Sequence, residues 1–471
     1  MCIEMKYSPK LAIDTLEYGD PFDQLQEGIE WLLQRTKREG LGASIRGIFD
    51  VSSTTRFAVN QVTQHTDLTE IRFDIRLVKG KQTATASTSL LGAAALENLF
   101  DTALSGLKSS PPIDFYQGLP SQKDISTKRL TGMAWSVEER VDAVILSVNS
   151  ALELDENLRT AGTASEVVNY MHLVSTEGTD IETSSNRNYF KINAIAGDPD
   201  QRGYGQEQLF WRFHEPDYEK MGQQSARVAL DTIKLIDLPA KNYEVLLSPQ
   251  AVSNLMVFLL FTTNGTTFHE STSYASDRLG DQILDSKITI KDSPLDPENA
   301  TIVYTTDFEG MPAQNQTLFQ NGTLKFIPYD SFEASKYLDD KNLATGNQLQ
   351  GFQGTMALPF SSVIEPGQRS LQEQIGEVED GLLVNEFWYN RFTIRREGGL
   401  TGLTRNGLFH IKMGEIQGAV RNLRYTESFV NAFGPDNVIS VGSERTKFQL
   451  INCPSLHLKD YRFSSVAHSF D

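Results

Sequence analysis

The chain has 471 residues, 39% of them hydrophobic and 10% aromatic, which is enough for two or three globular domains with sizeable cores. Its 43 basic and 61 acidic side chains give a formal net charge of −18, so nucleic acids and anionic membranes are not expected as partners. Only Cys2 and Cys453 are present, which excludes a disulfide framework. No apolar run is long enough to cross a bilayer, and the sequence predicts a cytoplasmic protein.

Helical and extended patterns alternate over the first part of the chain. Apolar residues recur every three to four positions over 20–40, which predicts an amphipathic helix. Ser136-Val137-Glu138-Glu139 is a capping box that opens another helix, ending near 153. A further helix is predicted over 92–108, and a linker rich in proline and glycine over 109–120. Strands are predicted over 43–49, 55–64, 70–78 and 83–89.

The middle of the chain contains the predicted domain boundary. A helix is expected over 217–236, and Leu238-Pro239 then interrupts the chain. We therefore divide the chain into an N-terminal α+β domain, 1–237, and a C-terminal β-rich domain, 238–471. Ser248-Pro249 starts a buried helix that continues to about 261. Strands are predicted over 159–163, 167–175, 182–196 and 207–214, and the glycines at 203, 205, 398 and 399 are interpreted as turn glycines.

The C-terminal part is predicted to consist mainly of strands and tight turns. Asn321-Gly322 and Asn406-Gly407 each favour a two-residue hairpin turn, because both dipeptides accept positive φ. Met413-Gly414-Glu415 is a further turn, and 416–425 is the return strand. Ser370-Leu371-Gln372-Glu373 opens a short helix. The expected fold class is therefore α+β in two parts, with helices and antiparallel sheet first and a β-rich domain second.

A ribbon of sequence at 381–428, with LVNEFWYNR, then TGLTRNGLF, GEIQGAV and LRYTES, resembles the C-terminal part of the TldD/PmbA family. Shorter blocks follow the order of that family, including GYGQEQLFWR at 203–212, YEVLLSPQAV at 243–252 and LPFSSVIEPGQRS at 358–370. The resemblance covers most of 20–465. It implies metallopeptidase-related proteins, also called modulators of DNA gyrase, whose two halves hold an extended peptide in a cleft between them.

The zinc motif of the active subunit of that family is missing from this chain. That motif, HExxxH, places two histidines on one helical face with a glutamate between them as general base, and a cysteine further along supplies a third ligand. This chain has no HExxxH, and its two closest histidines, His457 and His468, are eleven residues apart. His269-Glu270 falls near the expected place, but Tyr274, preceded by Ser273, stands where the second histidine would be, and neither is a comparable zinc ligand. Cys453 is expected to be a buried, inert thiol.

Two sets of residues are candidates for the functional site. His269 and Glu270 are weak catalytic candidates for a hydrolase with atypical ligands. Thr404, Arg405 and Asn406 are candidates for peptide binding at the tip of the predicted hairpin; the alternative is a solvated turn. Trp388 is expected in the core. Asp292, Asp296 and Glu298 are interpreted as a solvated turn, since they lack the spacing of a calcium loop. No G-x-S-x-G elbow supports a Ser-His-Asp triad, although such triads are spatial.

The resemblance and the missing motif together predict a TldE/PmbA-like subunit of a TldD/TldE-type protease system. Such a chain would have no metal site and no cofactor of its own, and zinc would be expected only in a TldD-type partner. It would dimerise with that partner or with itself and help to enclose unfolded peptides. Whether it is itself an enzyme stays open, and an active metallopeptidase or other hydrolase is the alternative.

Overall fold

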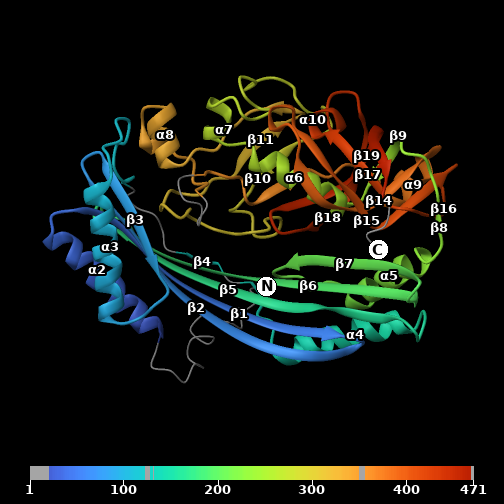
Figure 1. Ribbon diagram of the computed structural model, residues 1–471, viewed down its shortest axis with the longest axis horizontal. Helices are drawn as coiled ribbons and strands as arrows, with labels where there is room; N and C mark the ends of the chain where they lie inside the picture. Colours follow the sequence, from blue (N-terminus) through green and yellow to red (C-terminus); the bar gives the residue numbers. More distant parts are fainter. Residues whose placement is uncertain (1–20, 122–127, 131, 349–355, 468–471) are drawn as a thin grey trace, which may run out of the picture.

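The computed structural model describes residues 21–121, 128–130, 132–348 and 356–467. A long curved sheet forms one layer, and a second, β-rich part with its own sheet lies against one face of it (Figure 1). The chain is therefore α+β, as predicted. None of the described helices combines the length and the apolarity of a membrane-spanning segment.

The first sheet is built almost entirely from antiparallel strands, two of which are 19 residues long. Its order is β3-β2-β1-β5-β6, and both β7 and the parallel strand β4 pair with β6. The strands are β1 (Gly42–Ala58), β2 (Gln61–Lys79), β3 (Gln82–Thr88), β4 (Lys128–Leu130), β5 (Arg159–Ser175), β6 (Asp180–Asp198) and β7 (Gln201–Trp211).

Two strand predictions in this sheet were wrong in their bounds. The segment 55–64 is not one strand, because Val59 and Asn60 adopt φ of 49° and 65° and form the turn between β1 and β2. The predicted strands 159–163 and 167–175 are one continuous strand, β5, which pairs with β1 along its whole length. In both cases the pairing of long neighbouring strands sets the bounds, which local composition does not reveal.

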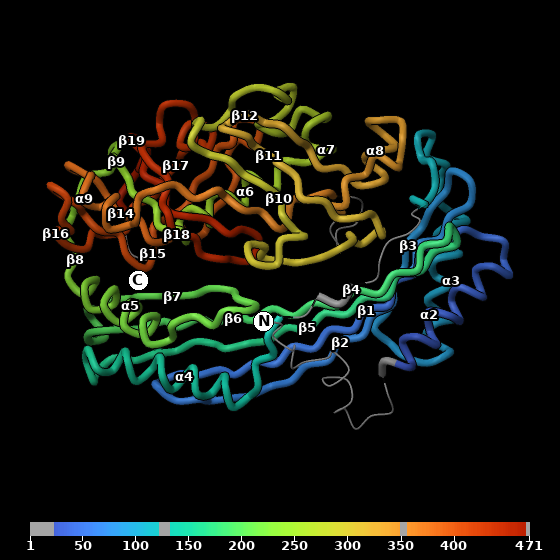
Figure 2. Tube along the Cα trace, turned by 180° about the vertical axis from the view of Figure 1, so that it is seen from behind, coloured from blue at the N-terminus to red at the C-terminus, as the bar shows by residue number. Residues whose placement is uncertain are grey.

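Four helices cover the outer face of this sheet, the face turned away from the second part (Figure 2). Helices α2 (Pro21–Arg38) and α3 (Ala93–Ser109) bury Leu25, Phe73 and Phe100 at one end of the sheet. Helices α4 (Val137–Leu152) and α5 (Tyr218–Asp231) cover the other end, where Trp135 and Phe190 are buried. The predicted helix 217–236 thus ends at Asp231, and Leu235–Ile236 form β8 instead.

Gly203 and Gly205 lie within β7, so their interpretation as turn glycines was wrong. A Cβ atom at either position would collide with backbone carbonyl oxygens of α5, those of Ala229 and Ser225. Glycine therefore allows α5 to approach the strand closely. Gly398, by contrast, has φ of 65° where a short 3₁₀ helix, η2 (Arg395–Glu397), ends before β15, as a turn glycine should.

The second sheet has its last strand at its centre, because β19 pairs with β9, β13, β17 and β18. Its strands are β8 (Leu235–Ile236), β9 (Asn242–Leu247), β10 (Ile290–Asp292), β11 (Gln316–Gln320), β12 (Thr323–Leu324), β13 (Ser362–Ile364), β14 (Asp380–Phe392), β15 (Gly399–Lys412), β16 (Glu415–Val420), β17 (Leu423–Ser428), β18 (Val438–Lys447) and β19 (Ile451–Val466). The helical segments are α6 (Pro249–Phe261), α7 (Gly265–His269), α8 (Ser331–Tyr337), η1 (Lys341–Leu343), α9 (Leu371–Glu377) and α10 (Phe429–Ala432).

The two Asn-Gly dipeptides behave differently. Asn321-Gly322 forms the predicted hairpin turn between β11 and β12, with φ of 47° and 75°. Asn406-Gly407 also has positive φ, 49° and 111°, but it lies inside β15 and produces a bulge opposite Asn385. The predicted hairpin tip at 406–407 was therefore wrong, and the chain reverses only at Met413-Gly414, before β16.

The helix starts predicted from capping residues are confirmed. Ser136 and Ser370 each form the reciprocal capping box with a glutamate three residues later. Ser248 caps α6 with Pro249 in the first turn, and this helix is buried beneath the second sheet.

Contacts near both ends of the first sheet help to hold the two parts together. At one end, Arg76 of β2 forms an ion pair of 2.9 Å with Glu309, and Arg46 of β1 donates to the Phe308 carbonyl oxygen at 3.0 Å. At the other end, β7 lies beside β15 and β18 (Figure 2). The domain boundary predicted at 237/238 stays a prediction; β8 already belongs to the second sheet. Of the predicted linker 109–120, Ser109 ends α3, and residues 110–120 contain no helix or strand, with Tyr116 and Leu119 buried.

Candidate functional site

The inner face of the first sheet is polar where it meets the second sheet. Phe190 and Ile192 of β6 point outward into the core under α4, so the alternating residues Tyr189 and Lys191 point inward. On β7, Gln208 pairs with Lys191 and Gln206 pairs with Asn193, so both glutamines share the inner face. We call the inter-sheet site the set formed by these four residues together with Glu386, Arg405 and Asn406.

Glu386 of β14 is the centre of the inter-sheet site. Its carboxylate accepts hydrogen bonds from Asn406 of β15 and, at 3.5 Å, from Gln206 Nε2 across the gap between the sheets. Burial raises the pKa of Glu386, and the Asn406 hydrogen bond and the charges of Lys191 and Arg405 oppose that rise. Burial lowers the pKa of Lys191, which Glu386 partly restores. The half-buried Glu386 and Lys191 thus form a polar layer with the exposed Arg405 at its border.

A chain of hydrogen bonds connects the first sheet to α6 beside this layer. The Tyr189 hydroxyl donates to Gln208 Oε1 at 2.6 Å, and Gln208 Nε2 donates to Gln250 Oε1 at 2.8 Å. Burial, followed by the charge of Glu386, raises the pKa of Tyr189 to about 12, so this hydroxyl remains protonated and remains a donor at neutral pH.

The exposed border of the site carries aromatic and arginine side chains. The Arg405 guanidinium lies 4.2 Å from the ring centre of Trp388, and Arg391 lies 4.5 Å from that of Tyr389. Trp388 is 42% exposed and Tyr389 57% exposed, so the prediction that Trp388 packs in the core was wrong. Tyr389 has φ of 57° in a second bulge of β14, a conformation that is costly for a bulky residue.

The three residues predicted to bind peptide do not all face the same way. Arg405 is exposed and Asn406 is half-buried, and both belong to the inter-sheet site. Thr404 points to the opposite side of β15, is 1% exposed, and bonds to Asn422 and the Leu423 amide. Alternation along β15 separates Thr404 from Arg405, and the bulge at Asn406-Gly407 interrupts that alternation, so Asn406 reaches Glu386 on the side of Arg405. The predicted turn would have placed all three residues at one tip.

His269 and Glu270 lie at the end of α7, away from the inter-sheet site. The His269 ring stacks on Tyr337 at 4.4 Å, and its Nε2 lies 3.0 Å from the Tyr329 hydroxyl. Glu270 is ion-paired with Lys336 at 2.9 Å, and hydrogen bonds from Lys336 and Tyr337 hold its pKa below the usual range. Burial lowers the pKa of His269 below its usual range. The charge of Asp277 opposes this shift, and the charge of Lys336 adds to it. Both side chains thus have protein partners.

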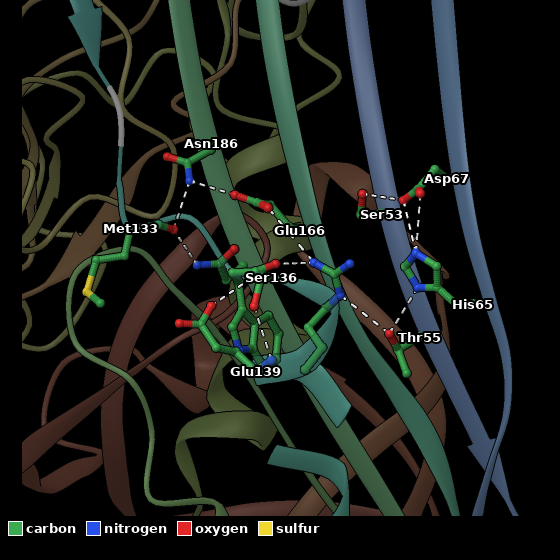
Figure 3. A network of polar contacts seen from close by, with 12 residues as sticks. Ser53, Thr55, His65, Asp67, Met133, Ser136, Glu139, Glu166 and Asn186 are labelled. Carbon is green, nitrogen blue, oxygen red and sulfur yellow. Dashed lines mark hydrogen bonds and ion pairs between the residues drawn. The ribbon is translucent and has the colours of Figure 1, made fainter. Parts of the chain in front are cut away.

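A second polar network lies on the outer face of the first sheet, beside α4 (Figure 3). Arg140 of α4 is 2% exposed, and it contacts the Trp135 carbonyl oxygen, Thr55 Oγ1 and Glu166. His65 Nδ1 lies 3.3 Å from Thr55 Oγ1, and His65 Nε2 lies 3.3 Å from Asp67. Thr55 is fully buried and so cannot reach a substrate, and the Ser53 hydroxyl donates to Asp67 instead of meeting the histidine. This is a structural network and not a catalytic triad.

Several buried carboxylates were missed by sequence analysis. Asp292 was interpreted as part of a solvated turn, but it is fully buried and accepts hydrogen bonds from the Ser361 amide and Asn347 Nδ2. Burial raises its pKa to about 7. Burial also raises the pKa of Asp307 to about 7. Its carboxylate accepts hydrogen bonds from the backbone amides of Glu309 and Met311, in the loop that contacts the first sheet. The residues near 296–298 are more exposed, as predicted.

The histidines do not assemble a metal site in the part of the chain that the structure describes. No three His, Cys, Asp or Glu side chains among residues 21–121, 128–130, 132–348 and 356–467 are grouped to hold a metal ion. Cys453 is buried, as expected for a structural thiol, and burial raises its pKa. Cys2 and His468 lie outside the described residues. The residues that the structure describes therefore offer no ligand set for the zinc ion that the family resemblance implies for an active subunit.

Two domain models of one protein family match this chain. The model of the PmbA/TldA metallopeptidase C-terminal domain matches residues 240–465, and the model of the central domain of the same family matches residues 134–233. No curated protein matches the chain at a significant level.

Solved structures share the fold over nearly the whole chain. TldE from Thermococcus kodakarensis has a TM-score of 0.84 at 18% identity and covers 93% of this chain and 100% of its own. A protein from Thermotoga maritima, named as a candidate modulator of a DNA gyrase, has a TM-score of 0.81 at 22% identity with the same coverage. A similarly named protein from Bacteroides thetaiotaomicron has a TM-score of 0.77 at 16% identity, covering 94% of this chain and 99% of that one. At these identities the likeness shows the fold alone.

Proposed function

The chain belongs to the PmbA/TldD metallopeptidase family, and on that premise we propose that it is a TldE-type subunit without a zinc site of its own. It pairs with a zinc-bearing family member and helps to enclose unfolded peptides against the inter-sheet site. The single observation that carries this proposal is a family scaffold whose inner face is polar while its described residues offer no metal-ligand group.

The chemistry of the inter-sheet site suits an extended peptide. A peptide backbone presents carbonyl acceptors and amide donors at regular intervals, and each needs a partner when it leaves water. Arg405 and Lys191 are donors, Glu386 is an acceptor, and Gln206 is both. The rings of Trp388 and Tyr389, exposed at the border, can cover apolar side chains without demanding one sequence. Such a surface is suited to unfolded chains of varied sequence.

The hydrolase alternative has less support. Glu270 is held by Lys336 and Tyr337, and His269 by Tyr329 and Tyr337, so a general base and a ligand would first have to leave these partners. Among the residues that the structure describes, His269 also does not belong to a group of three side chains that could hold a metal ion. Whether the isolated chain hydrolyses peptides is therefore part of the experiment that follows.

The test is reconstitution with a zinc-bearing member of the family. We expect the purified chain to contain no stoichiometric zinc by elemental analysis and to leave an unstructured peptide intact. Mixed with the partner, it should form a complex in light scattering, burying on the order of 1,600 Å² as stable interfaces do, and increase cleavage. A partner whose zinc-ligand histidine is replaced is the matched control, and it should form the complex without cleavage.

Two results would contradict the proposal. One is cleavage by the isolated chain that a chelator abolishes, together with one equivalent of zinc that is lost in His269→Ala. The other is a strictly monomeric chain that leaves the rate of the partner unchanged.

A further inference from the structure

Four basic side chains from both sheets gather where β7 meets β18. Arg187 lies on β6, Arg212 directly follows β7, and Arg445 and Lys447 lie at the end of β18. Asn188 pairs with Trp211, so the register brings Arg187 and Arg212 next to each other as the following pair. Burial lowers the pKa of Lys447, and the charges of Arg212 and Arg445 lower it further. We call these four residues the basic cluster.

The positive charge of the basic cluster is poorly compensated at Arg187. Burial lowers the pKa of Arg187 to about 10, with no carboxylate opposing the shift, and none of the described residues forms an ion pair with it. Burial and then the charge of Arg187 lower the pKa of Arg212 to about 10. A half-buried charge without a counter-ion destabilises a fold, and this chain has 61 acidic side chains from which a partner could have come. Arg187 therefore costs stability that a ligand can restore.

The Arg187 guanidinium is held in one orientation. It lies 4.5 Å from the ring centre of Phe210, which itself lies 4.5 Å from the ring centre of Tyr189 in the inter-sheet site. Its Nη1 donates to the Gln449 carbonyl oxygen at 3.3 Å. A guanidinium carries five N–H donors in a fixed fork that matches the two oxygens of a carboxylate. Stacking on one face and one backbone contact leave most of that fork for a ligand.

A pocket adjoins the basic cluster at Arg445, which is the member of the cluster that lines it. Arg445 donates to Asn299 Oδ1 at 2.5 Å and forms part of the wall of a pocket of about 390 Å³. Other polar residues line that pocket, among them Lys291, Ser293, Asp296, Asn299 and Glu365. Lys291 is already paired with Glu365 at 2.5 Å, so Arg445 is the cation of this wall that has no carboxylate within ion-pair distance among the described residues.

The carboxylates near Lys447 limit the charge of the ligand. The charges of Glu298 and Asp296 oppose the lowering of the Lys447 pKa by burial, and the Lys447 ammonium contacts the Glu298 carbonyl oxygen. These acidic groups and the net charge of −18 disfavour a dianion or a polyanion. A single carboxylate matches the remaining charge best.

We propose that the basic cluster binds a carboxylate of the captured peptide, either its C-terminal carboxylate or an acidic side chain, with Arg187 as the main donor. This inference rests on the proposed function, since it names the class of peptide that the inter-sheet site holds. It places one fixed anchor at the β6–β18 end of a surface that is otherwise tolerant of sequence.

The test compares three fluorescently labelled versions of one short, unstructured, neutral peptide on the full-length chain. They carry a free C-terminal carboxylate, a C-terminal amide, or a C-terminal amide with one internal glutamate. Fluorescence anisotropy should show tighter binding of at least one carboxylate-bearing version, by about tenfold, as expected for charge-assisted hydrogen bonds. The version that gains identifies the source of the carboxylate.

Arg187→Gln should abolish this difference and leave the amide peptide unaffected. The matched control is Arg202→Gln, which removes the same charge from an exposed arginine at the start of β7 and should preserve the difference. The thermal midpoint of Arg187→Gln should equal or exceed that of the wild type, because an uncompensated charge is removed. Should that variant unfold early, Arg187→Lys keeps the charge without the fork, and it should lose at least about threefold in affinity for the carboxylate peptide.

Equal binding of all three peptides, binding of none, or a difference that survives Arg187→Gln would overturn the inference. Complex formation with the zinc-bearing partner is measured without peptide, so the proposed function can stand when the carboxylate site fails. Loss of complex formation would instead contradict the proposed function itself.

Discussion

The two faces of the first sheet differ in what packs against them. The outer face carries Phe73, Ile75 and Phe190 beneath four helices, and these side chains are at most 1% exposed. The inner face carries Tyr189, Lys191 and Gln208 opposite the second sheet, and none of them is fully buried. One set of strands thus stabilises the fold through one face and presents hydrogen-bonding groups through the other. Changes on the two faces should therefore have separable effects.

The largest effect on stability should come from the outer face. Phe73→Ala removes a ring that is 1% exposed and that packs closely against Gly28 of α2. We expect a loss of about 3–5 kcal/mol in the free energy of unfolding, from lost transfer energy and a residual cavity. Urea unfolding measures it, and peptide binding below the transition should be unchanged. If Phe73→Ala kept the wild-type free energy of unfolding but bound peptide poorly, the two faces would not have separate roles.

An intermediate effect should depend on pH. Glu207 of β7 lies on the outer face near Lys220, and burial raises its pKa to about 7 against the opposing charge of Lys220. The folded state therefore binds this proton more tightly than the unfolded state, so its contribution to stability falls as pH rises from about 4.5 to about 7. Glu207→Gln should leave stability at pH 5 nearly unchanged and raise it at pH 8 by roughly 1–3 kcal/mol.

Urea unfolding of both proteins at pH 5 and pH 8 measures this difference. Glu97→Gln, at an exposed position of α3, is the control and should change neither value. An equal gain at both pH values would mean that Glu207 is destabilising for a reason other than its charge.

The smallest effect on stability should come from the border of the inter-sheet site. Arg405 is exposed and stacks on Trp388, so Arg405→Ala should change the free energy of unfolding by no more than roughly 0.5 kcal/mol. Peptide capture and partner-dependent cleavage should nevertheless weaken. Arg424→Ala, on the exposed side of β17, is the matched control for lost charge. If the midpoint falls by several degrees while binding persists, Arg405 is a structural residue.

Sequence patterns predicted elements well wherever a local rule determines them. Ser136, Ser248 and Ser370 located three helix starts because a cap is a contact between near neighbours. Asn406-Gly407 misled the prediction, although the same dipeptide at Asn321-Gly322 did form a hairpin. The conformation of both is similar, but β14 continues past Asn385 and pairs with both sides of the 406–407 bulge. Only the partner strand distinguishes a bulge from a turn.

The candidate site was predictable in part and for related reasons. Arg405 was identified from the ribbon that resembles the family, yet its partners Lys191 and Glu386 lie about 200 positions apart. Polar and apolar residues alternate over 189–193 in the sequence, and this pattern could have indicated a solvated inner face. The convergence of Arg187 with Lys447 could not have been seen, because it depends on how the two sheets dock. Sequence patterns do not show which residues that are distant in the chain meet in the folded protein.

The central position of β19 in the second sheet has a consequence for synthesis. The first sheet is complete once residue 211 has been made, so it can form while the rest of the chain is still on the ribosome. The second sheet has no such option, since β9, β13, β17 and β18 find their common neighbour only when residues 451–466 emerge. Until then their edges stay unpaired, and such edges are prone to wrong pairing. During synthesis, the C-terminal half therefore needs protection against wrong strand pairing for longer than the N-terminal half.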